Sequence, residues 1–498
     1  MDILEIINKL NLKEEEYELY GKDKAKLNVD YSNLKGKLIL ITSTNPTPYG
    51  EGKTTLNIGL TDSLNKLGYK TISTLREPSL GPVFGVKGGA TGGGKAVVLP
   101  QDDINLHFTG DFHAVTSANN LLSAIIDNHI YQGNELNIDK VVFNRCLDVN
   151  DRALRKVVVQ NREDKFDITP ASEIMAILCL SKDITDLKTR LSNIIVGYNT
   201  NNEKIYVKDL HCEDALTILL KDAIKPNLVS TLYKNPCIIH GGPFANIAHG
   251  CNTIIATKTA LSLADYVVTE AGFGSDCGAL KFFDIKARLN NLNPICVVVN
   301  TTIKALKYNG NDDITKGIDN LKFHIENMKK YNDNVIVSLN KFDDDKEEDI
   351  EYVRNYCNKL DTKFVVSTMF KDGEDGCLDL AKEVVNLENT KHYEAYNLDD
   401  DLQTKIEKVC ELYNCHNIEY KCLDKIKNIH DNYPICIAKT PMSITDDPKK
   451  LGYPTDYTMT VTDVKVLNGA GFIVVYMGDI MTMPGLAKHS KYLDMIIR

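Results

Sequence analysis

A lysine and a threonine that follow a glycine-rich turn are the first residues in the chain whose types and spacing could do chemistry. They close a string made of Thr47, Pro48, Tyr49, Gly50, Glu51, Gly52, Lys53 and Thr54. In such a turn the backbone N–H groups close around phosphate oxygens, the lysine attracts the outer phosphates, and the threonine hydroxyl can reach Mg²⁺. Thr47 stands where the usual pattern has its first glycine, and a bare Gly-Lys-Thr also occurs at ordinary helix starts. The apolar run before the string favours a phosphate-binding loop.

A second glycine-rich element covers residues 81–95. Val, Phe and Pro are interspersed among its glycines, which is not typical of a flexible linker. The backbone N–H groups of Gly88 and Gly89, beside Lys87, could form an anion nest. Arg76, just before this element, could make a bidentate contact with a carboxylate or an acyl phosphate. An arginine at a strand end is more often a surface ion-pair partner. Activation of a carboxylate is therefore only one of two interpretations of Arg76.

Seven short apolar runs, rich in β-branched residues, must position these charged groups. The runs cover 37–43, 70–75, 140–144, 265–269, 294–300, 334–339 and 363–367. Their alternation with helical or polar segments is typical of a parallel sheet buried on both faces, and a helix is expected over 53–67, stopped by Gly68. The predicted fold class is α/β, with a P-loop parallel-sheet nucleotide-binding core and smaller α/β domains.

Polar residues follow the apolar runs at the points where the strands should end. They are Arg76, Asn144, Arg145, Glu270, Asn300 and 340–342. Ligands of parallel sheets collect beyond the carboxyl ends of the strands. We therefore expect these residues to share one large site with the phosphate loop.

Composition excludes some classes of partner. The net charge of −10 argues against a nucleic-acid binder, because a phosphate backbone demands a basic face. The chain has no apolar run near the ~20 residues that span a bilayer, and its amphipathic start carries acidic residues unlike a secretory signal. The 13 cysteines are scattered and form no C-x-x-C pair, which favours reduced thiols over a zinc site. A cytoplasmic protein with no membrane and no nucleic-acid partner is expected.

Long strings of the sequence resemble formate–tetrahydrofolate ligase, in the same order from about residue 40 to about residue 490. The strings include TPYGEGKTT at 47–55, LREPSLGPVFGVKGGA at 75–90, DINLHFTGDFHA at 103–114, HGGPFANIAHG at 240–250, VTEAGFG at 268–274 and GDIMTMPGL at 478–486. The resemblance implies an ATP-dependent carbon–nitrogen ligase. ATP would phosphorylate formate to formyl phosphate, and N10 of tetrahydrofolate would attack it to give 10-formyltetrahydrofolate, ADP and phosphate.

The resemblance also implies roles for single residues. Lys53 would act on the transferring phosphoryl group, Arg76 would hold formyl phosphate, and 47–54 would be the ATP loop. Lys87, Gly88 and Gly89 would supply further anion contacts. Mg²⁺ is implied by ATP, with Thr54 and Glu77 as the predicted ligands and with Asp111 and Glu270 also open as carboxylates.

The folate half of the resemblance depends on aromatic residues. The family holds the folate ring between a Phe and a Trp, and Phe342 matches the Phe, but the chain contains no Trp. Met369 stands at the Trp position, with Phe370 beside it as an alternative aromatic surface. The family is typically a homotetramer and binds a monovalent cation, so both are implied here together with the small molecules ATP, formate and tetrahydrofolate.

Three domains are expected. Residues 1–150 and 236–385 would form the P-loop domain for ATP and formyl phosphate, 151–235 a mainly helical inserted segment, and 386–498 a C-terminal α/β domain.

Two other interpretations are open. Asn340, Lys341, Phe342 and Asp343 fit the guanine-reading N-K-x-D pattern, so a P-loop GTPase or ATPase switch is one alternative, which strong GTP selectivity without formate dependence would indicate. A folate-binding relative that has lost catalysis is the other.

Overall fold

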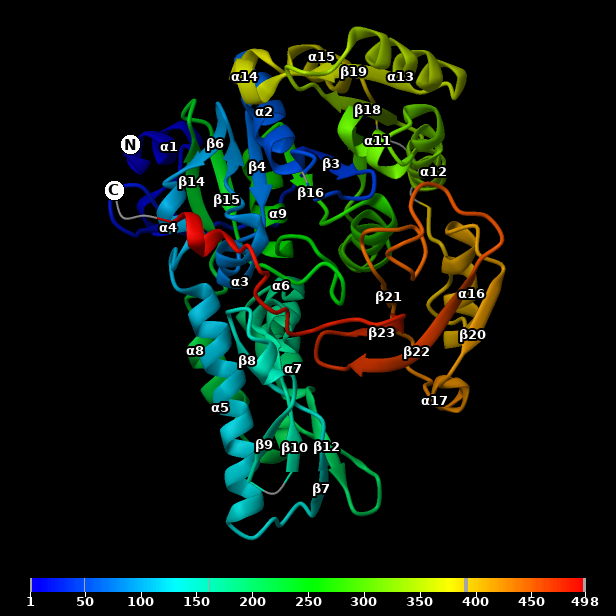
Figure 1. Cartoon of the computed structure of the whole chain (residues 1–498). Helices are drawn as coiled ribbons and strands as arrows, with labels where there is room; N and C mark the ends of the chain where they lie inside the picture. Colours follow the sequence, from blue (N-terminus) through cyan, green and yellow to red (C-terminus); the bar gives the residue numbers. More distant parts are fainter. Residues whose placement is uncertain (1, 49, 161, 389–392, 496–498) are drawn as a thin grey trace.

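The computed structural model describes residues 2–48, 50–160, 162–388 and 393–495. Its centre is a large, mostly parallel sheet in the upper part of Figure 1. Seven neighbouring strands run parallel, in the order β15, β4, β16, β3, β17, β18, β19. Their bounds are Pro236–Ile239, Thr71–Leu75, Tyr266–Glu270, Lys37–Ser43, Pro294–Thr301, Val335–Asn340 and Lys363–Ser367. The predicted fold class is confirmed.

Antiparallel strands extend the sheet beyond β15. They are β14 (Asn227–Thr231), β2 (Ala25–Leu27), β1 (Tyr17–Leu19) and the short pair β5 (Gly92–Gly93) and β6 (Ala96–Leu99). The second glycine-rich element therefore ends in a small ribbon that joins this side of the sheet.

The parallel strands are apolar on both faces because helices cover both. Along β3, Leu38 and Leu40 pack into one core, and Ile39 and Ile41 pack into a second core on the opposite face. Helices α1, α9, α11, α12 and α13 contribute to the first core, and helices α2 and α15 to the second. Their bounds are Ile3–Leu10, Ile254–Leu263, Ile303–Asn309, Ile314–Tyr331, Glu347–Lys359, Lys53–Lys66 and Leu378–Val385.

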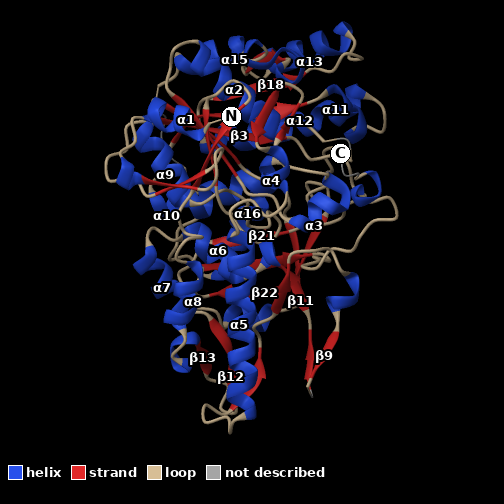
Figure 2. Ribbon diagram, turned by 90° about the vertical axis from the view of Figure 1, so that its left-hand side faces the viewer, coloured by secondary structure: helices blue, strands red, loops and turns tan. Residues whose placement is uncertain are grey.

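A second unit forms the lower part of the molecule, and the long helix α5 (Asp111–Tyr131) runs down it beside α8 (Figure 2). It also contains a three-stranded antiparallel sheet and two short strand pairs. Its further elements are α6 (Glu173–Leu180), α7 (Ile184–Ser192), α8 (Glu213–Leu220), β7 (Ile138–Val141), β8 (Arg145–Leu147), β9 (Val157–Val159), β10 (Arg162–Asp164), β11 (Phe166–Ile168), β12 (Ile195–Asn199) and β13 (Lys204–Tyr206).

The prediction that the run 140–144 belongs to the parallel sheet is wrong. The strand there, β7, pairs antiparallel with β12 in the second unit. Asn144 donates from Nδ2 to Asp167 Oδ2 at 2.8 Å, and Arg145 forms ion pairs with Asp127 and Asp164. A short apolar run does not reveal its partner strand, because pairing is settled by tertiary contacts. Asn144 and Arg145 therefore lie outside the predicted edge.

The C-terminal unit is built on a four-stranded sheet in the order β20, β22, β23, β21. The strands cover Asn417–Tyr420, Thr458–Leu467, Phe472–Met477 and Ile435–Ala438, and they pack with α16 (Leu402–Leu412) and α17 (Leu423–Lys427). The chain then returns to the main sheet, where the short helix η9 (Lys491–Asp494) packs on η2 (Val83–Lys87) in the glycine-rich element (Figure 1).

The predicted domain boundaries remain a proposal.

No helix in the described ranges is both long and apolar enough to cross a membrane.

Candidate active site

The phosphate loop joins β3 to α2, as expected from the sequence. Gly50 and Gly52 adopt positive φ angles of 77° and 71°, which side chains rarely tolerate. A Cβ on Gly52 would also lie 2.5 Å from Asn340 Nδ2. Gly52 caps α2, so the helix N-terminus opens toward the loop. Tyr49 lies outside the described residues.

Two strand ends hold the loop in place through the backbone of Glu51. Its carbonyl oxygen accepts from Asn300 Nδ2 at 2.6 Å and from Asn340 Nδ2 at 3.2 Å. Its side chain is buried and accepts from the Thr47 N–H at 2.7 Å. Burial raises the pKa of Glu51, and the Thr47 contacts oppose that rise. The prediction that polar residues at the ends of β17 and β18 lie at the loop is confirmed.

Lys53 is the first residue of α2, and its Nζ donates to Phe273 O at 2.6 Å. Desolvation lowers the pKa of Lys53 to about 8, and the charges of Arg76 and Lys87 add to this effect while Glu270 opposes it. Lys53 therefore lies beside the turn at Gly272 and Phe273, next to the loop.

Arg76 follows β4, and its guanidinium group lies against Pro243 and Gly272. Its Nη1 donates to Pro243 O at 3.4 Å, and its buried Nε has no hydrogen-bond partner among the described residues. A Cβ on Gly272 would lie 3.0 Å from both Nη1 and Nη2, so only glycine leaves room for the guanidinium there. A guanidinium with donors to spare fits an incoming carboxylate or phosphate.

Lys87 comes from the second glycine-rich element. Much of its side chain is exposed, but desolvation first and the Arg76 charge second lower the pKa of its ammonium group. Gly88 has a φ of 78°, and a Cβ on Gly89 would lie 2.9 Å from Asn105 Nδ2. Both predicted anion-contact glycines therefore occupy positions that require glycine.

The predicted pairing of Thr54 with Glu77 for a cation is not formed. Thr54 Oγ1 instead donates to both carboxylate oxygens of Glu270, at 3.0 and 3.2 Å. Glu77 lies in a separate buried cluster, where burial first and then the Asp111 charge raise its pKa well above the ordinary value. Neighbouring residues of an extended segment point to opposite sides, so Arg76 and Glu77 cannot serve the same cleft.

Hard oxygen donors suit Mg²⁺, and the hydroxyl of Thr54 with the carboxylate of Glu270 fits that preference. The described residues contain no group of three or more His, Cys, Asp or Glu side chains that could hold a metal ion. A cation at the phosphate loop would thus share its coordination with the phosphates, as Mg²⁺ does in nucleotide sites.

Met369 corrects the prediction of a folate contact at that position. Its side chain is 0% exposed and packs against Gly59 of α2 in the second core, so it presents no surface to a ligand. The neighbouring Phe370 is 58% exposed and lies against Gly93 and Gly94. Both residues lie in α14 (Met369–Asp372), a single short turn, where adjacent side chains point in different directions. Of these two residues, only Phe370 presents an exposed surface.

Phe342 follows β18 and is half-buried, with Lys304 Nζ 4.8 Å from its ring centre. Its segment lies beside that of Phe370. The Lys341 N–H donates to Ser367 O at 3.0 Å, and Lys371 forms an ion pair with Asp343. The fold thus brings the two aromatic segments to one edge of the sheet.

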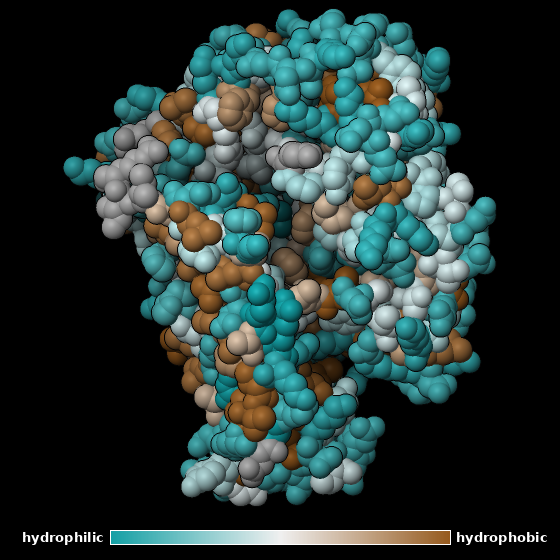
Figure 3. Space-filling model, in the orientation of Figure 1, coloured by the Kyte–Doolittle hydropathy of each residue, from teal (hydrophilic) through white to brown (hydrophobic). Residues whose placement is uncertain are grey.

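A sizeable cavity lies away from these residues. It has a volume of about 960 Å³ and separates the second unit from the C-terminal sheet, with Lys140, Asp167, Tyr198, Lys465 and Tyr476 among its lining. The face in Figure 3 is hollowed where the upper and lower parts meet. Size alone does not locate chemistry, and the convergent charged groups at the phosphate loop are the stronger indication.

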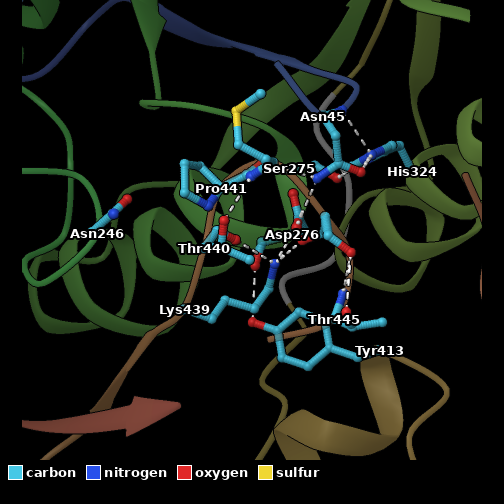
Figure 4. Close-up of polar contacts among 12 residues, drawn as sticks. Asn45, Asn246, Ser275, Asp276, His324, Tyr413, Lys439, Thr440, Pro441 and Thr445 are labelled. Carbon is cyan, nitrogen blue, oxygen red and sulfur yellow. Dashed lines mark hydrogen bonds and ion pairs between the residues drawn. The ribbon is translucent and has the colours of Figure 1, made fainter. Parts of the chain in front are cut away.

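One polar cluster escaped prediction from the sequence. Asn45, Asp276, His324 and Lys439 form a buried network (Figure 4), in which Asn45 lies two residues before Thr47 of the phosphate loop. These residues are far apart in the chain, so their spacing gave no signal that they meet.

Comparison with known proteins identifies the family of the chain. A family model described as formate–tetrahydrofolate ligase matches residues 1–498. A formate–tetrahydrofolate ligase of Campylobacter concisus is 53% identical, over 99% of this chain and 95% of that protein. Another of Campylobacter curvus is also 53% identical, over 98% and 94% respectively. Since the match spans the whole chain and includes the loop and cleft residues above, the chain belongs to the formate–tetrahydrofolate ligase family, a family of ligases.

Proposed function

We propose that the chain joins formate to tetrahydrofolate at the expense of ATP, giving 10-formyltetrahydrofolate, ADP and phosphate through formyl phosphate. The observation that carries the proposal is that Lys53 and Arg76 meet at one turn beside the loop, since Lys53 Nζ donates to Phe273 O and a Cβ on Gly272 would lie 3.0 Å from the Arg76 guanidinium. A binding site for ATP alone would not need Arg76 there. An acyl phosphate carries its negative charge next to the reacting carbon, and Arg76 supplies the matching donors.

The residues act by position and charge. Lys53 and the N-terminus of α2 would neutralise charge on the phosphates while a formate oxygen attacks the terminal phosphorus and ADP leaves. Arg76 and Lys87 would hold the resulting formyl phosphate until N10 of tetrahydrofolate attacks its carbon and phosphate leaves. Mg²⁺ near Thr54 and Glu270 would shield charge between the phosphates. Water must be kept out, because it would hydrolyse the acyl phosphate.

The folate ring would lie on the aromatic surfaces of Phe342 and Phe370. Their segments are adjacent, and Phe370 lies against the glycine-rich element. A monovalent cation, a homotetrameric assembly and a cytoplasmic location are implied by the family resemblance and stay predictions.

The switch alternative is not favoured. A guanine-reading asparagine must be free to contact the base, but Asn340 is engaged with the loop backbone through Glu51 O. The lost-catalysis alternative is opposed by the persistence of Lys53, Arg76 and Lys87 in one cleft.

A coupled assay with ATP, formate and tetrahydrofolate tests the proposal. The full chain should form 10-formyltetrahydrofolate only when all three are present, and Lys53→Ala should lower kcat by about 100-fold or more, as loss of one transition-state donor does. Lys66→Ala is the matched control, because Lys66 lies on the same helix but pairs with Glu374 and Asp375 at the surface. No product from the unchanged chain, or equal activity of Lys53→Ala, would refute the assignment.

A further inference from the structure

A buried ion pair links the C-terminal unit to the neighbourhood of the phosphate loop (Figure 4). Lys439, directly after β21, lies with Nζ 2.6 Å from Asp276 Oδ2, and both side chains are 0% exposed. The same Nζ donates to Ser443 O at 2.5 Å and to Thr440 O at 3.2 Å, so each of its three protons has an acceptor. Replacing a buried ion pair by apolar side chains of similar shape is often neutral or stabilising. Stability alone therefore does not explain why this pair is charged.

Asp276 carries the contact onward to Asn45. Asn45 Nδ2 donates to Asp276 Oδ2 at 3.1 Å and to Pro441 O at 3.2 Å. Asn45 lies between the end of β3 and Thr47, where the strand becomes the phosphate loop. The C-terminal unit thus touches the root of the loop twice, once through the ion pair and once through the Pro441 carbonyl.

Helix α12 holds Asn45 from another side. The Asn45 N–H donates to His324 Nε2 at 3.1 Å, and Asn320 Nδ2 donates to Asn45 Oδ1 at 2.8 Å. Burial lowers the pKa of His324 to about 4, so the ring is neutral near pH 7 and its Nε2 can accept. With Nε2 as acceptor, Nδ1 carries the proton toward Ser275 Oγ, 2.7 Å away. Asn45 consequently has a single well-defined position.

The turn that carries Asp276 also carries the acceptor for Lys53. Phe273 O accepts from Lys53 Nζ at 2.6 Å and from Ser43 Oγ at 3.0 Å, and Phe273 has a φ of 59°. A Cβ on Gly274 would lie 2.6 Å from Asp276 Oδ1 and 3.2 Å from Thr44 O. Because this turn packs so closely on the strand end, a shift of Asp276 would move the Phe273 carbonyl as well.

We propose that Lys439 is a positioning residue for the ATP site. It acts through Asp276 on two points, Asn45 at the root of the phosphate loop and the Phe273 carbonyl that anchors Lys53. The C-terminal unit then takes part in nucleotide binding without Lys439 contacting the nucleotide. This inference rests on the proposed ATP-dependent function. Its test measures ATP affinity directly, so that the role of Lys439 and the proposed function can be refuted separately.

The test replaces the pair by apolar side chains in the full chain. Lys439→Met alone leaves Asp276 buried and unpaired, so its Tm should fall. Lys439→Met combined with Asp276→Leu removes both charges and should regain most of that Tm. ATP affinity, measured by calorimetry, should nevertheless stay about 10- to 100-fold weaker than in the unchanged chain, as expected for displaced contact groups. KM for tetrahydrofolate should not change.

Lys405→Met is the matched control. Lys405 is another buried lysine of the C-terminal unit, and its Nζ donates to Tyr433 O at 3.1 Å, away from the loop. It should lower Tm without weakening ATP binding. Wild-type ATP affinity in the double variant, or equal weakening by Lys405→Met, would overturn the proposal and leave Lys439 a purely structural residue.

Asn45→Ala tests the role of Lys439 by a second route, which is needed if the double variant does not fold. It cuts the link to Asp276 but leaves the ion pair in place, so ATP affinity should weaken about as much. A folded Asn45→Ala chain with unchanged ATP affinity would overturn the proposal. If the unchanged chain binds ATP but forms no 10-formyltetrahydrofolate, the proposed function fails while these affinity comparisons still decide the role of Lys439.

Discussion

At the scale of single residues, the environment of Lys53 in the ligand-free protein disfavours its charged form. Its ammonium group is desolvated, has two cationic neighbours and rests on one backbone carbonyl. Each of these features except the carbonyl contact makes the charged form less favourable than it is in water. A triphosphate reverses the balance, because it brings several negative charges to the same place. The cost of gathering the cations in the free protein would thus be offset by the proposed binding of ATP.

The pH dependence of ATP binding should report on this residue. The pKa of Lys53 is lowered to about 8 in the free protein, and bound ATP should raise it. ATP affinity is therefore expected to be level near neutral pH and to weaken as pH rises through about 8, with proton uptake on binding at about pH 8.5. Calorimetry in two buffers of different ionisation enthalpy measures that uptake, which Lys53→Met should reduce. An affinity that stays constant through this range would contradict the expectation.

Adjacent residues of α14 should respond to truncation in opposite ways. Phe370→Ala removes an exposed ring, so it should raise KM for tetrahydrofolate, leave KM for ATP unchanged and hardly alter Tm. Met369→Ala empties a buried position and should lower the free energy of unfolding by about 2–5 kcal/mol. Steady-state kinetics and urea unfolding of the two variants separate these outcomes. A folate effect from Met369→Ala at unchanged stability would show that the ligand reaches the buried residue after all.

At the scale of elements, α2 is buried on nearly every side rather than along one stripe. Its residues from Thr55 to Leu64 are all buried, between the sheet and the segment that contains α14 and α15. Gly59 is the point of closest approach, since a Cβ there would overlap Met369 and would lie 3.3 Å from Cys377 Sγ. The helix that begins with Lys53 therefore also fixes α14, which carries Phe370.

Gly59→Ala tests this coupling between elements. Helix propensity favours alanine by about 1 kcal/mol, but overpacking costs about 1–3 kcal/mol, so the variant should be destabilised. Because the closest clash is with Met369 Cβ, which alanine would keep, Gly59→Ala combined with Met369→Gly should be more stable than the sum of the two single changes predicts. Urea unfolding of the four chains measures the coupling. Strict additivity would mean that the two residues do not meet in solution.

At the scale of the whole molecule, the C-terminal unit is attached to both other units. The turn between β22 and β23 lies on the second unit, where Glu173 accepts from the Gly469 and Ala470 N–H groups at 2.8 and 3.3 Å. Asn468 Nδ2 also donates to Asn193 O at 2.9 Å. The Lys439 network makes the second attachment, to the sheet. These contacts, together with the packing of η9 on η2, connect the three units.

Glu173 should make the first attachment sensitive to pH. Burial raises its pKa from 4.5 to about 7 in the folded chain. The folded chain then binds this proton more tightly than the unfolded chain, so the associated stability is present below about pH 4.5 and is lost as pH rises through about 7. Glu173→Gln should therefore gain Tm relative to the unchanged chain between about pH 5 and pH 8, measured by calorimetric melting. Glu163→Gln, at an exposed site, is the control and should track the unchanged chain.

The sequence by itself determined six of the seven parallel strands, the helix that starts at Lys53, and the glycines of the phosphate loop. The strand that it missed is β15, and the run at 140–144 was wrongly assigned to this sheet. The features that it determined follow from local rules, because an apolar run, a helix stop and a positive φ each depend on residues close in the chain. The same local rules placed Asn300 and Asn340 at the carboxyl ends of their strands, where the structure uses them to hold the loop.

Only the tertiary structure decided which side chains meet. It paired Thr54 with Glu270 instead of Glu77, turned Met369 into the core and Phe370 outward, and assigned the run at 140–144 to another sheet. It also brought Lys439 to Asp276 and Asn45 across most of the chain. Such contacts depend on the direction of each side chain and on long-range packing, neither of which the spacing of residues specifies.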